Sequence, residues 1–136
     1  MLDLTSLEKA AGQLEKALRY AVHARQNGEA ELFEQFRNSV IQTFEYTYEL
    51  SCKLMRRSLI ERAASADEIE SLSFQDTIRE AARAGLLDDP ERWFVFRTIR
   101  NKTSHAYDEA YASEAYATAV DFLPRAKDLL TRLRGA

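Results

Sequence analysis

One stretch of this 136-residue chain concentrates the side chains that could do chemistry. Between residues 97 and 107, an arginine, a histidine and a tyrosine follow the spacing Arg-x4-His-x-Tyr. The polar and charged candidates there are Arg97, Arg100, Asn101, Ser104, His105 and Tyr107. Each residue of a helix turns by about 100°, so the first five of these candidates fall within an arc of roughly 140°. Arg100 and His105 would then be able to reach one small anion.

The other side of this stretch carries Val95, Phe96, Ile99 and Thr103. The pattern predicts a helix that buries its aliphatic side and presents a cationic, hydrogen-bonding side. If that helix ends near Thr103, His105 would lie in the turn beyond it.

Two long helices are predicted to precede this stretch. Thr5 and Glu8 have the spacing of a capping box, and Asn27-Gly28 ends the first helix. The second helix is predicted from residue 29 or 30 to about 64, with inward positions that recur every three or four residues. Those positions are Phe33, Phe36, Val40, Phe44, Tyr48, Ser51, Met55 and Leu59. We expect this helix to form the centre of the core.

A polar connection and a short helix are predicted next. Residues 65–72 are polar and weakly periodic, and we expect them to form a connection. A short helix follows over 74–84, with Ser73 as its cap and Gly85 as the left-handed residue that closes it.

The remaining helices complete the predicted fold. Asp89 and Pro90 start the helix that carries the reactive stretch. The last helix begins between 108 and 113, and Pro124 is predicted to kink or split it. The prediction is a single all-α domain over residues 1–136, an up-and-down four-helix bundle with an extra short helix.

Composition restricts the function classes. The net charge of −3 does not favour nucleic-acid binding, so any such binding must come from a local basic patch. Arg56, Arg57 and Arg62 are first interpreted as a solvated helix end rather than an RNA contact. The lone Cys52 excludes an internal disulfide and is interpreted as a small core residue.

The sequence carries no nucleotide-binding or metal signature, since it has neither a Gly-Ser with spaced aspartates nor a P-loop. No apolar run approaches the ~18 residues of a membrane span. The first residues lack the basic and apolar regions of a signal peptide. We therefore expect a cytoplasmic protein that does not contact a membrane and uses neither a metal nor a cofactor.

The reactive stretch resembles the signature of the HEPN superfamily of small all-α proteins. Within that superfamily, the resemblance is to the nucleotidyltransferase substrate-binding proteins and the HepT toxins, whose signature reads Arg-Asn-x-x-x-His-x-Tyr. Here it is Arg100-Asn101, His105 and Tyr107.

Two further segments resemble the same proteins, and the resemblance covers roughly residues 5–133. Residues 41–50 resemble the family's IQ-x-FE-[YF]-T-[YF]-E-L helix. Residues 84–89, followed by Trp93, resemble its AGL-[IL]-xD…W turn. Cys52 is a departure, because these proteins usually carry tryptophan there.

The resemblance implies two functions. The first is a substrate-binding partner subunit of a separately encoded small nucleotidyltransferase, in a two-component system of the toxin–antitoxin type. The alternative is a metal-independent RNase toxin that is silenced when the partner enzyme transfers AMP to Tyr107. Both imply a homodimer or higher homo-oligomer, and a nucleotide or RNA as ligand.

In the RNase alternative, the resemblance assigns a role to each residue. Arg100 holds the scissile phosphate, and His105 acts as general base or acid. Asn101 and Ser104 orient the histidine or a phosphate oxygen, and Arg97 lines a groove between subunits.

Simpler interpretations remain open for each residue. Arg97 and Arg100 could only form ion pairs with Glu45 or Glu49 on the second helix. His105 could only cap a helix end, and Tyr107 could only pack at a subunit contact. A dimeric helical scaffold with a vestigial site is a third reading of the whole chain.

Overall fold

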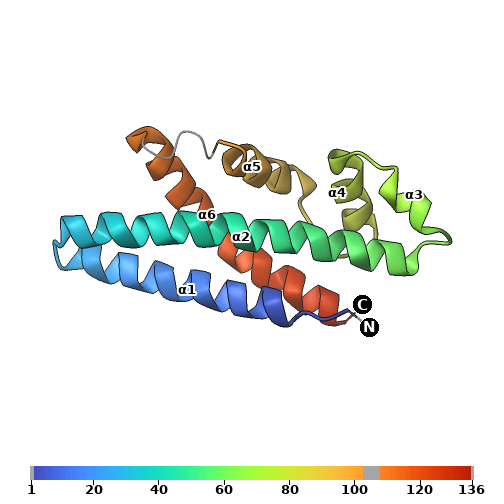
Figure 1. The fold of residues 1–136 in the computed structure, drawn as a ribbon, viewed down its shortest axis with the longest axis horizontal. Helices are drawn as coiled ribbons and strands as arrows, with labels where there is room; N and C mark the ends of the chain where they lie inside the picture. The colour runs from blue at the N-terminus through green and yellow to red at the C-terminus, as the bar shows by residue number, and fades with distance from the viewer. Residues whose placement is uncertain (1, 103–107, 136) are drawn as a thin grey trace.

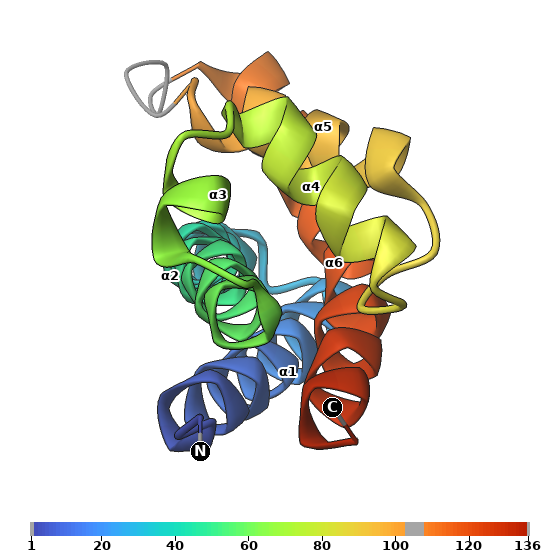
Figure 2. The same ribbon diagram turned by 90° about the vertical axis from the view of Figure 1, so that its right-hand side faces the viewer.

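The computed structural model describes residues 2–102 and 108–135, and within these ranges the chain forms six helices (Figure 1). They are α1 (Thr5–Gln26), α2 (Ala30–Arg62), α3 (Ala66–Glu70), α4 (Phe74–Arg83), α5 (Pro90–Arg100) and α6 (Glu109–Arg134). The first two helices run antiparallel side by side, and α6 packs against both (Figures 1 and 2). Helices α3 to α5 lie along the side of α2 that faces away from α1. The predicted all-α helical bundle is confirmed.

Helix α1 begins and ends through local hydrogen bonds. The predicted capping role of Thr5 is wrong, because Thr5 is already the first helical residue. Its backbone N–H donates to the Asp3 carboxylate at 3.0 Å, so the preceding aspartate satisfies that donor. The predicted stop is confirmed, since Gly28 has a φ of 70° and the Glu29 N–H donates back to the Ala24 carbonyl at 2.9 Å.

The predicted connection between α2 and α4 contains the short helix α3, so its assignment as a plain connection is wrong. The Ser65 hydroxyl caps this helix by accepting from the Asp67 N–H at 3.3 Å. Ile69 is its one buried residue, and a single apolar residue produces no periodic pattern. The start of α4 is as predicted, with Ser73 accepting from the Asp76 N–H at 3.1 Å.

The ends of α4 and α5 also follow their sequence signals. Gly85 has a φ of 81°, and the next N–H, of Leu86, donates to the Ala81 carbonyl at 2.9 Å. The Asp89 carboxylate accepts from the Arg92 N–H at 3.3 Å, and Pro90 occupies the first position of α5.

Helix α6 runs unbroken through Pro124, so the predicted split does not occur. Pro124 and Val120 are both exposed. The carbonyl that loses its helical donor is therefore on the solvent side of the helix, where water can replace that donor. Burial of Phe122 and Ala126 on the opposite side holds both halves of α6 in line.

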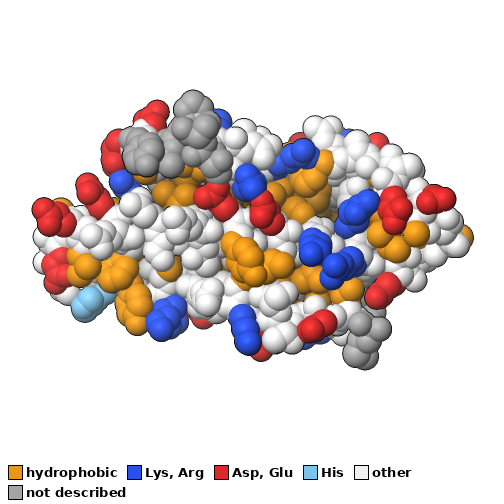
Figure 3. Space-filling view, viewed as in Figure 1, with side chains coloured by type: hydrophobic (Ala, Val, Ile, Leu, Met, Phe, Trp, Pro, Cys, Tyr) orange, Lys and Arg blue, Asp and Glu red, His pale blue; other side chains and the backbone are white. Residues whose placement is uncertain are grey.

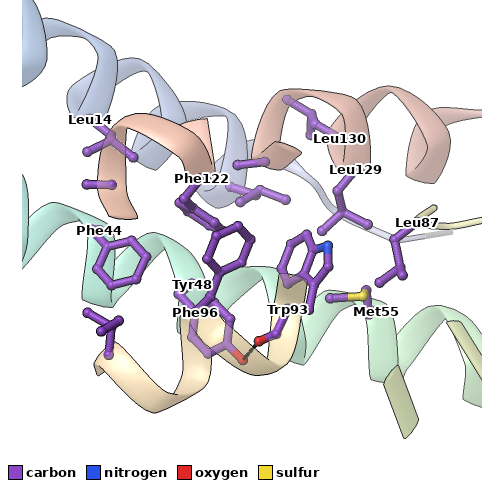
Figure 4. Close-up of a cluster of buried hydrophobic side chains, with 14 of the residues drawn as sticks. Leu14, Phe44, Tyr48, Met55, Leu87, Trp93, Phe96, Phe122, Leu129 and Leu130 are labelled. Carbon is purple, nitrogen blue, oxygen red and sulfur yellow. Dashed lines mark hydrogen bonds between the residues drawn. The ribbon is translucent and has the colours of Figure 1, made fainter. Parts of the chain in front are cut away.

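An aromatic cluster joins α2, α5 and α6 (Figure 4). It consists of Phe44 and Tyr48 from α2, Trp93 and Phe96 from α5, and Phe122 from α6. The Phe122 ring lies edge-on to Phe96 and Phe44, at centroid distances of 5.1 and 5.2 Å. The Tyr48 hydroxyl donates to the Trp93 carbonyl at 3.2 Å, which satisfies its polar group inside the core. This packing fixes α5 on α2, and so decides where the end of α5 lies.

Candidate functional site

Among the described residues, the buried side of α5 differs from the predicted side at one position, and Thr103 lies outside those residues. Phe96 lies at its centre, with Trp93 and Ile99 each about 60° away around the helix. Val95 lies about 100° from Phe96 and is 51% exposed. Its predicted place on the buried side is therefore wrong. Trp93, Phe96 and Ile99 form the buried side, and Val95 lies outside the arc that they span.

Arg100 is the last residue of α5 and reaches across to α2. Its guanidinium forms an ion pair with the carboxylate of Glu49. The Arg100 side chain is 30% exposed and that of Glu49 is 53% exposed, so the pair remains in contact with solvent. The ion pair with the second helix is confirmed for Arg100, and a further role of this residue at a ligand stays a prediction. That pairing holds the partly exposed guanidinium of Arg100 at the end of α5.

Glu45, one turn before Glu49 on α2, is a second carboxyl near this cation. It is half-buried, and its burial raises the pKa of its carboxyl while the positive charge of Arg100 opposes part of that rise. The sequence suggested Glu45 only as an ion-pair partner. Its place between buried Phe44 and Tyr48 was the available signal that it would be partly desolvated.

Tyr111 brings α6 into the same corner. Its hydroxyl donates to the Ile99 carbonyl at 3.3 Å, close to the end of α5. Burial raises the pKa of this phenol, and the charge of Glu45 adds to the rise. Sequence reasoning gave Tyr111 no role, and its spacing from the reactive stretch carries no recognisable motif.

Arg97 points to a different neighbour. Its guanidinium carbon lies 3.9 Å from the centre of the Phe74 ring on α4, which is the geometry of a cation–π contact. Within the described residues, no carboxylate oxygen lies within 4.0 Å of this guanidinium. The ion pair suggested for Arg97 with Glu45 or Glu49 is therefore wrong. Arg97 and Arg100 lie one turn apart but contact different helices.

The other predicted residues follow the end of α5. Asn101 is exposed, and its backbone N–H donates to the Arg97 carbonyl at 2.9 Å. Lys102 pairs with Glu114 of α6 at 3.5 Å. Ser104, His105 and Tyr107 lie outside the described residues, so their assigned roles stay predictions.

A buried arginine anchors the start of α6. The guanidinium of Arg37 on α2 donates to both carboxylate oxygens of Glu109, at 2.7 and 2.8 Å. This pairing lowers the pKa of the Glu109 carboxyl and raises the pKa of Arg37. Because Glu109 is the first residue of α6, the contact positions the helix that follows the reactive stretch. Sequence reasoning missed Arg37, since the two residues are 72 positions apart.

The described ranges contain neither a metal-binding cluster nor a membrane-spanning helix. Over residues 2–102 and 108–135, there is no cluster of three or more His, Cys, Asp or Glu side chains arranged to hold a metal ion. None of the helices in those ranges combines the length and apolar character needed to cross a membrane.

A family model and a solved structure each match nearly the whole length of this chain. A family model described as nucleotidyltransferase substrate binding protein like matches residues 2–135. A solved structure from Haemophilus influenzae, described as the fold of a substrate binding domain of a nucleotidyltransferase, aligns with a TM-score of 0.88 at 36% identity. The alignment covers 97% of this chain and 99% of that one.

A curated protein supports the same relationship. It is named probable ribonuclease HepT, from Haemophilus influenzae, and is 46% identical over 94 residues. The match covers 69% of this chain, and the chain spans 64% of the length of that relative. On the evidence of sequence and fold together, this chain belongs to the family of proteins like the nucleotidyltransferase substrate-binding protein.

Proposed function

We propose that this protein is the substrate-binding partner subunit of a separately encoded small nucleotidyltransferase, in a two-component system of the toxin–antitoxin type. The observation that carries the proposal is the partly exposed guanidinium of Arg100 at the end of α5, in a chain whose fold matches a protein described as such a substrate-binding domain. An arginine at a helix end is suited to contact a nucleotide phosphate.

The ion pair with Glu49 is compatible with ligand binding. Both side chains retain contact with solvent, and exposed ion pairs contribute only about 0–1 kcal/mol to stability. A phosphate could therefore take the place of the Glu49 carboxylate at Arg100 with little cost to the fold. Until then, Glu49 holds the guanidinium in place.

The test is co-expression with the adjacent nucleotidyltransferase, followed by purification and intact-mass measurement. A stable complex with unchanged mass supports a binding subunit. A mass gain of one or more AMP units, absent from Tyr107→Phe, supports the modified toxin instead. If the experiment shows no complex and also no mass gain, the proposal is contradicted.

The second candidate is a metal-independent endoribonuclease, favoured by the similarity to a protein named probable ribonuclease HepT. In this reaction His105 removes the proton from a ribose 2′-hydroxyl, and that oxygen attacks the neighbouring phosphorus. The bond to the 5′-oxygen breaks, and this leaving oxygen takes up a proton. Arg100 stabilises the charge that develops on the phosphate oxygens. A His105→Ala protein that cleaves RNA as fast as wild type would end this candidate.

Modification of Tyr107 would connect the two candidates. The nucleotidyltransferase would transfer AMP from ATP to the phenol oxygen, releasing pyrophosphate and the phenol proton. The added phosphodiester is negative and bulky, so next to Arg100 it would exclude an RNA phosphate by charge and by volume. The protein would then be both the partner and the substrate of the enzyme.

The family resemblance implies a homodimer for both candidates, and the endoribonuclease needs one because one histidine cannot easily be base and acid in the same step. On α2 the exposed Tyr46 and half-buried Leu50 lie one turn apart, and apolar surface is visible over the middle of α2 (Figure 3). We place the dimer contact there, close to Glu49. Analytical ultracentrifugation of wild type and Tyr46→Glu tests this, with a monomeric variant as the expected result.

A further inference from the structure

Basic side chains without a carboxylate partner gather beside α2. Lys53, Arg56 and Arg57 are exposed on α2, and Arg97 faces them from α5 across Phe74. Among the residues that the structure describes, none of these four has a carboxylate oxygen within 4.0 Å. The cations of α6 behave differently, since all of them are ion-paired: Arg125, Lys127, Arg132 and Arg134. Lys9, Lys16, Arg25 and Arg62 lack such a partner as well within the described residues. What sets Lys53, Arg56, Arg57 and Arg97 apart is that they line the two hollows beside Phe74.

Two hollows lie among these cations, one on each side of Phe74. The first has a volume of about 490 Å³ and is lined by residues that include Cys52, Arg56, Arg57 and Phe74. The second has a volume of about 410 Å³, and its lining includes Phe74, Phe94 and Arg97. Figure 3 shows basic and apolar side chains interleaved over this part of α2, below α4 and α5. We call the two hollows together the basic groove.

The basic groove adjoins the corner that holds Arg100. On α2, Glu49, Lys53 and Arg56 follow one another at steps of four and three residues, so they share one side of the helix. Arg56 lies about 10 Å from Glu49 along the helix axis. On α5, Arg97 lies one turn before Arg100. An extended ligand held at Arg100 could therefore continue into the groove.

We propose that the basic groove binds single-stranded RNA. Its phosphates contact Lys53, Arg56 and Arg57, and its bases pack against the half-buried rings of Phe74 and Phe94. The proposal rests on the endoribonuclease candidate, for which it supplies the path of the strand next to the cleaved phosphate. It also revises the first interpretation of Arg56 and Arg57 as only a solvated helix end.

The aromatic walls favour a nucleic acid over an acidic protein segment. Proteins that hold single strands combine a cationic groove with aromatic side chains on which bases stack. The guanidinium of Arg97, held over the Phe74 ring, offers both a charge for a phosphate and a planar surface for a base. The wall at Cys52 adds no negative charge, because burial raises the pKa of this thiol to about 12.

The experiment measures binding without cleavage. A short fluorescein-labelled oligouridylate, 2′-O-methylated throughout, lacks the nucleophile and is titrated by anisotropy at several salt concentrations. Arg56→Gln/Arg57→Gln is compared with the matched control Lys9→Gln/Lys16→Gln, two exposed cations on α1, which lines neither hollow.

We expect the groove variant to bind the oligouridylate roughly tenfold more weakly at physiological salt. The slope of log affinity against log salt should be shallower by about 1.4. The control should match wild type. Phe74→Leu, which retains every charge, should weaken binding roughly tenfold without changing the slope.

The result that overturns the proposal is equal binding by the groove variant and the control, including the case in which no protein binds. Loss of the nucleotidyltransferase partner from the groove variant, with RNA binding intact, would also overturn it, because the groove would then be a protein contact. Cleavage of unmodified RNA is measured separately. Wild type that binds but never cleaves would reject the endoribonuclease and leave the groove, whereas groove variants that bind and cleave normally would reject the groove alone.

Discussion

The aromatic core and the charged corner at the end of α5 are formed by the same helices but depend on different interactions. In the core, Tyr48, Trp93 and Phe122 are each at most 3% exposed, and their rings lie 5.7 to 6.0 Å apart. In the corner, the carboxylate of Glu49 is 53% exposed and is paired with Arg100. Tyr48 and Glu49 are neighbours in the chain, so one residue step separates the two regions.

The difference separates stability from ligand binding. Burial of a large apolar side chain contributes about 1.5–3 kcal/mol, whereas an exposed ion pair contributes about 0–1 kcal/mol. The core can therefore hold α5 in place while the corner exchanges Glu49 for another anion. Substitutions in the two regions should affect different measurements.

The largest effect on stability is expected for Phe122→Ala. This ring contacts four other aromatic rings and is 0% exposed, so its removal should lower the free energy of unfolding by about 3–5 kcal/mol. Urea unfolding followed by circular dichroism measures the change. The control is Val120→Ala on the exposed side of the same helix, and equal losses from both variants would contradict the assigned core.

Arg100→Gln should have the opposite profile. We expect RNA cleavage to fall roughly a hundredfold, because a positioned charge at the phosphate is lost. The free energy of unfolding should change by less than about 1 kcal/mol. Arg83→Gln, which removes an exposed ion pair with Glu80, is the control for charge. A stability loss as large as that of Phe122→Ala would make Arg100 a structural residue.

Arg37→Met probes a contact that is intermediate between these regions, since Arg37 is 8% exposed but its partner Glu109 is largely exposed. The variant should be less stable than wild type at neutral pH, by less than Phe122→Ala. The pairing lowers the pKa of Glu109, so its contribution is complete above the ordinary carboxyl pKa and is lost as pH falls through the lowered value.

Thermal unfolding across acid and neutral pH measures the difference between Arg37→Met and wild type. A double-mutant cycle with Glu109→Gln isolates the pair. A stability difference that did not shrink at acid pH would show that Arg37 acts through packing alone.

The smallest effect is expected for Glu45→Gln. Burial raises the pKa of Glu45, so between the unfolded and folded pKa values the folded protein binds more protons and stability falls as pH rises. The amide variant removes this cost and should be slightly more stable than wild type at neutral pH, with the gain vanishing below the ordinary carboxyl pKa. Melting temperatures measured against pH, with exposed Glu91→Gln as control, check this. A gain that is the same at every pH would contradict the explanation.

Most of the helix boundaries could be predicted from the sequence. Ser73, Gly85 and Asp89 act where predicted, because a cap or a left-handed turn is completed within five residues of chain. Helix α3 was missed because one buried residue gives no period. The unbroken course of α6 at Pro124 depends on which side of the helix is buried, and the local sequence does not state that.

The sequence by itself determined the all-α bundle, its family and the stretch that carries Arg100. Only the tertiary structure decided the partners of the arginines: Arg100 with Glu49, Arg97 with Phe74, and Arg37 with Glu109. The physical reason is that these contacts join different helices. They depend on the position that the aromatic core sets for α5 and α6 on α2, and spacing along the chain does not encode that position.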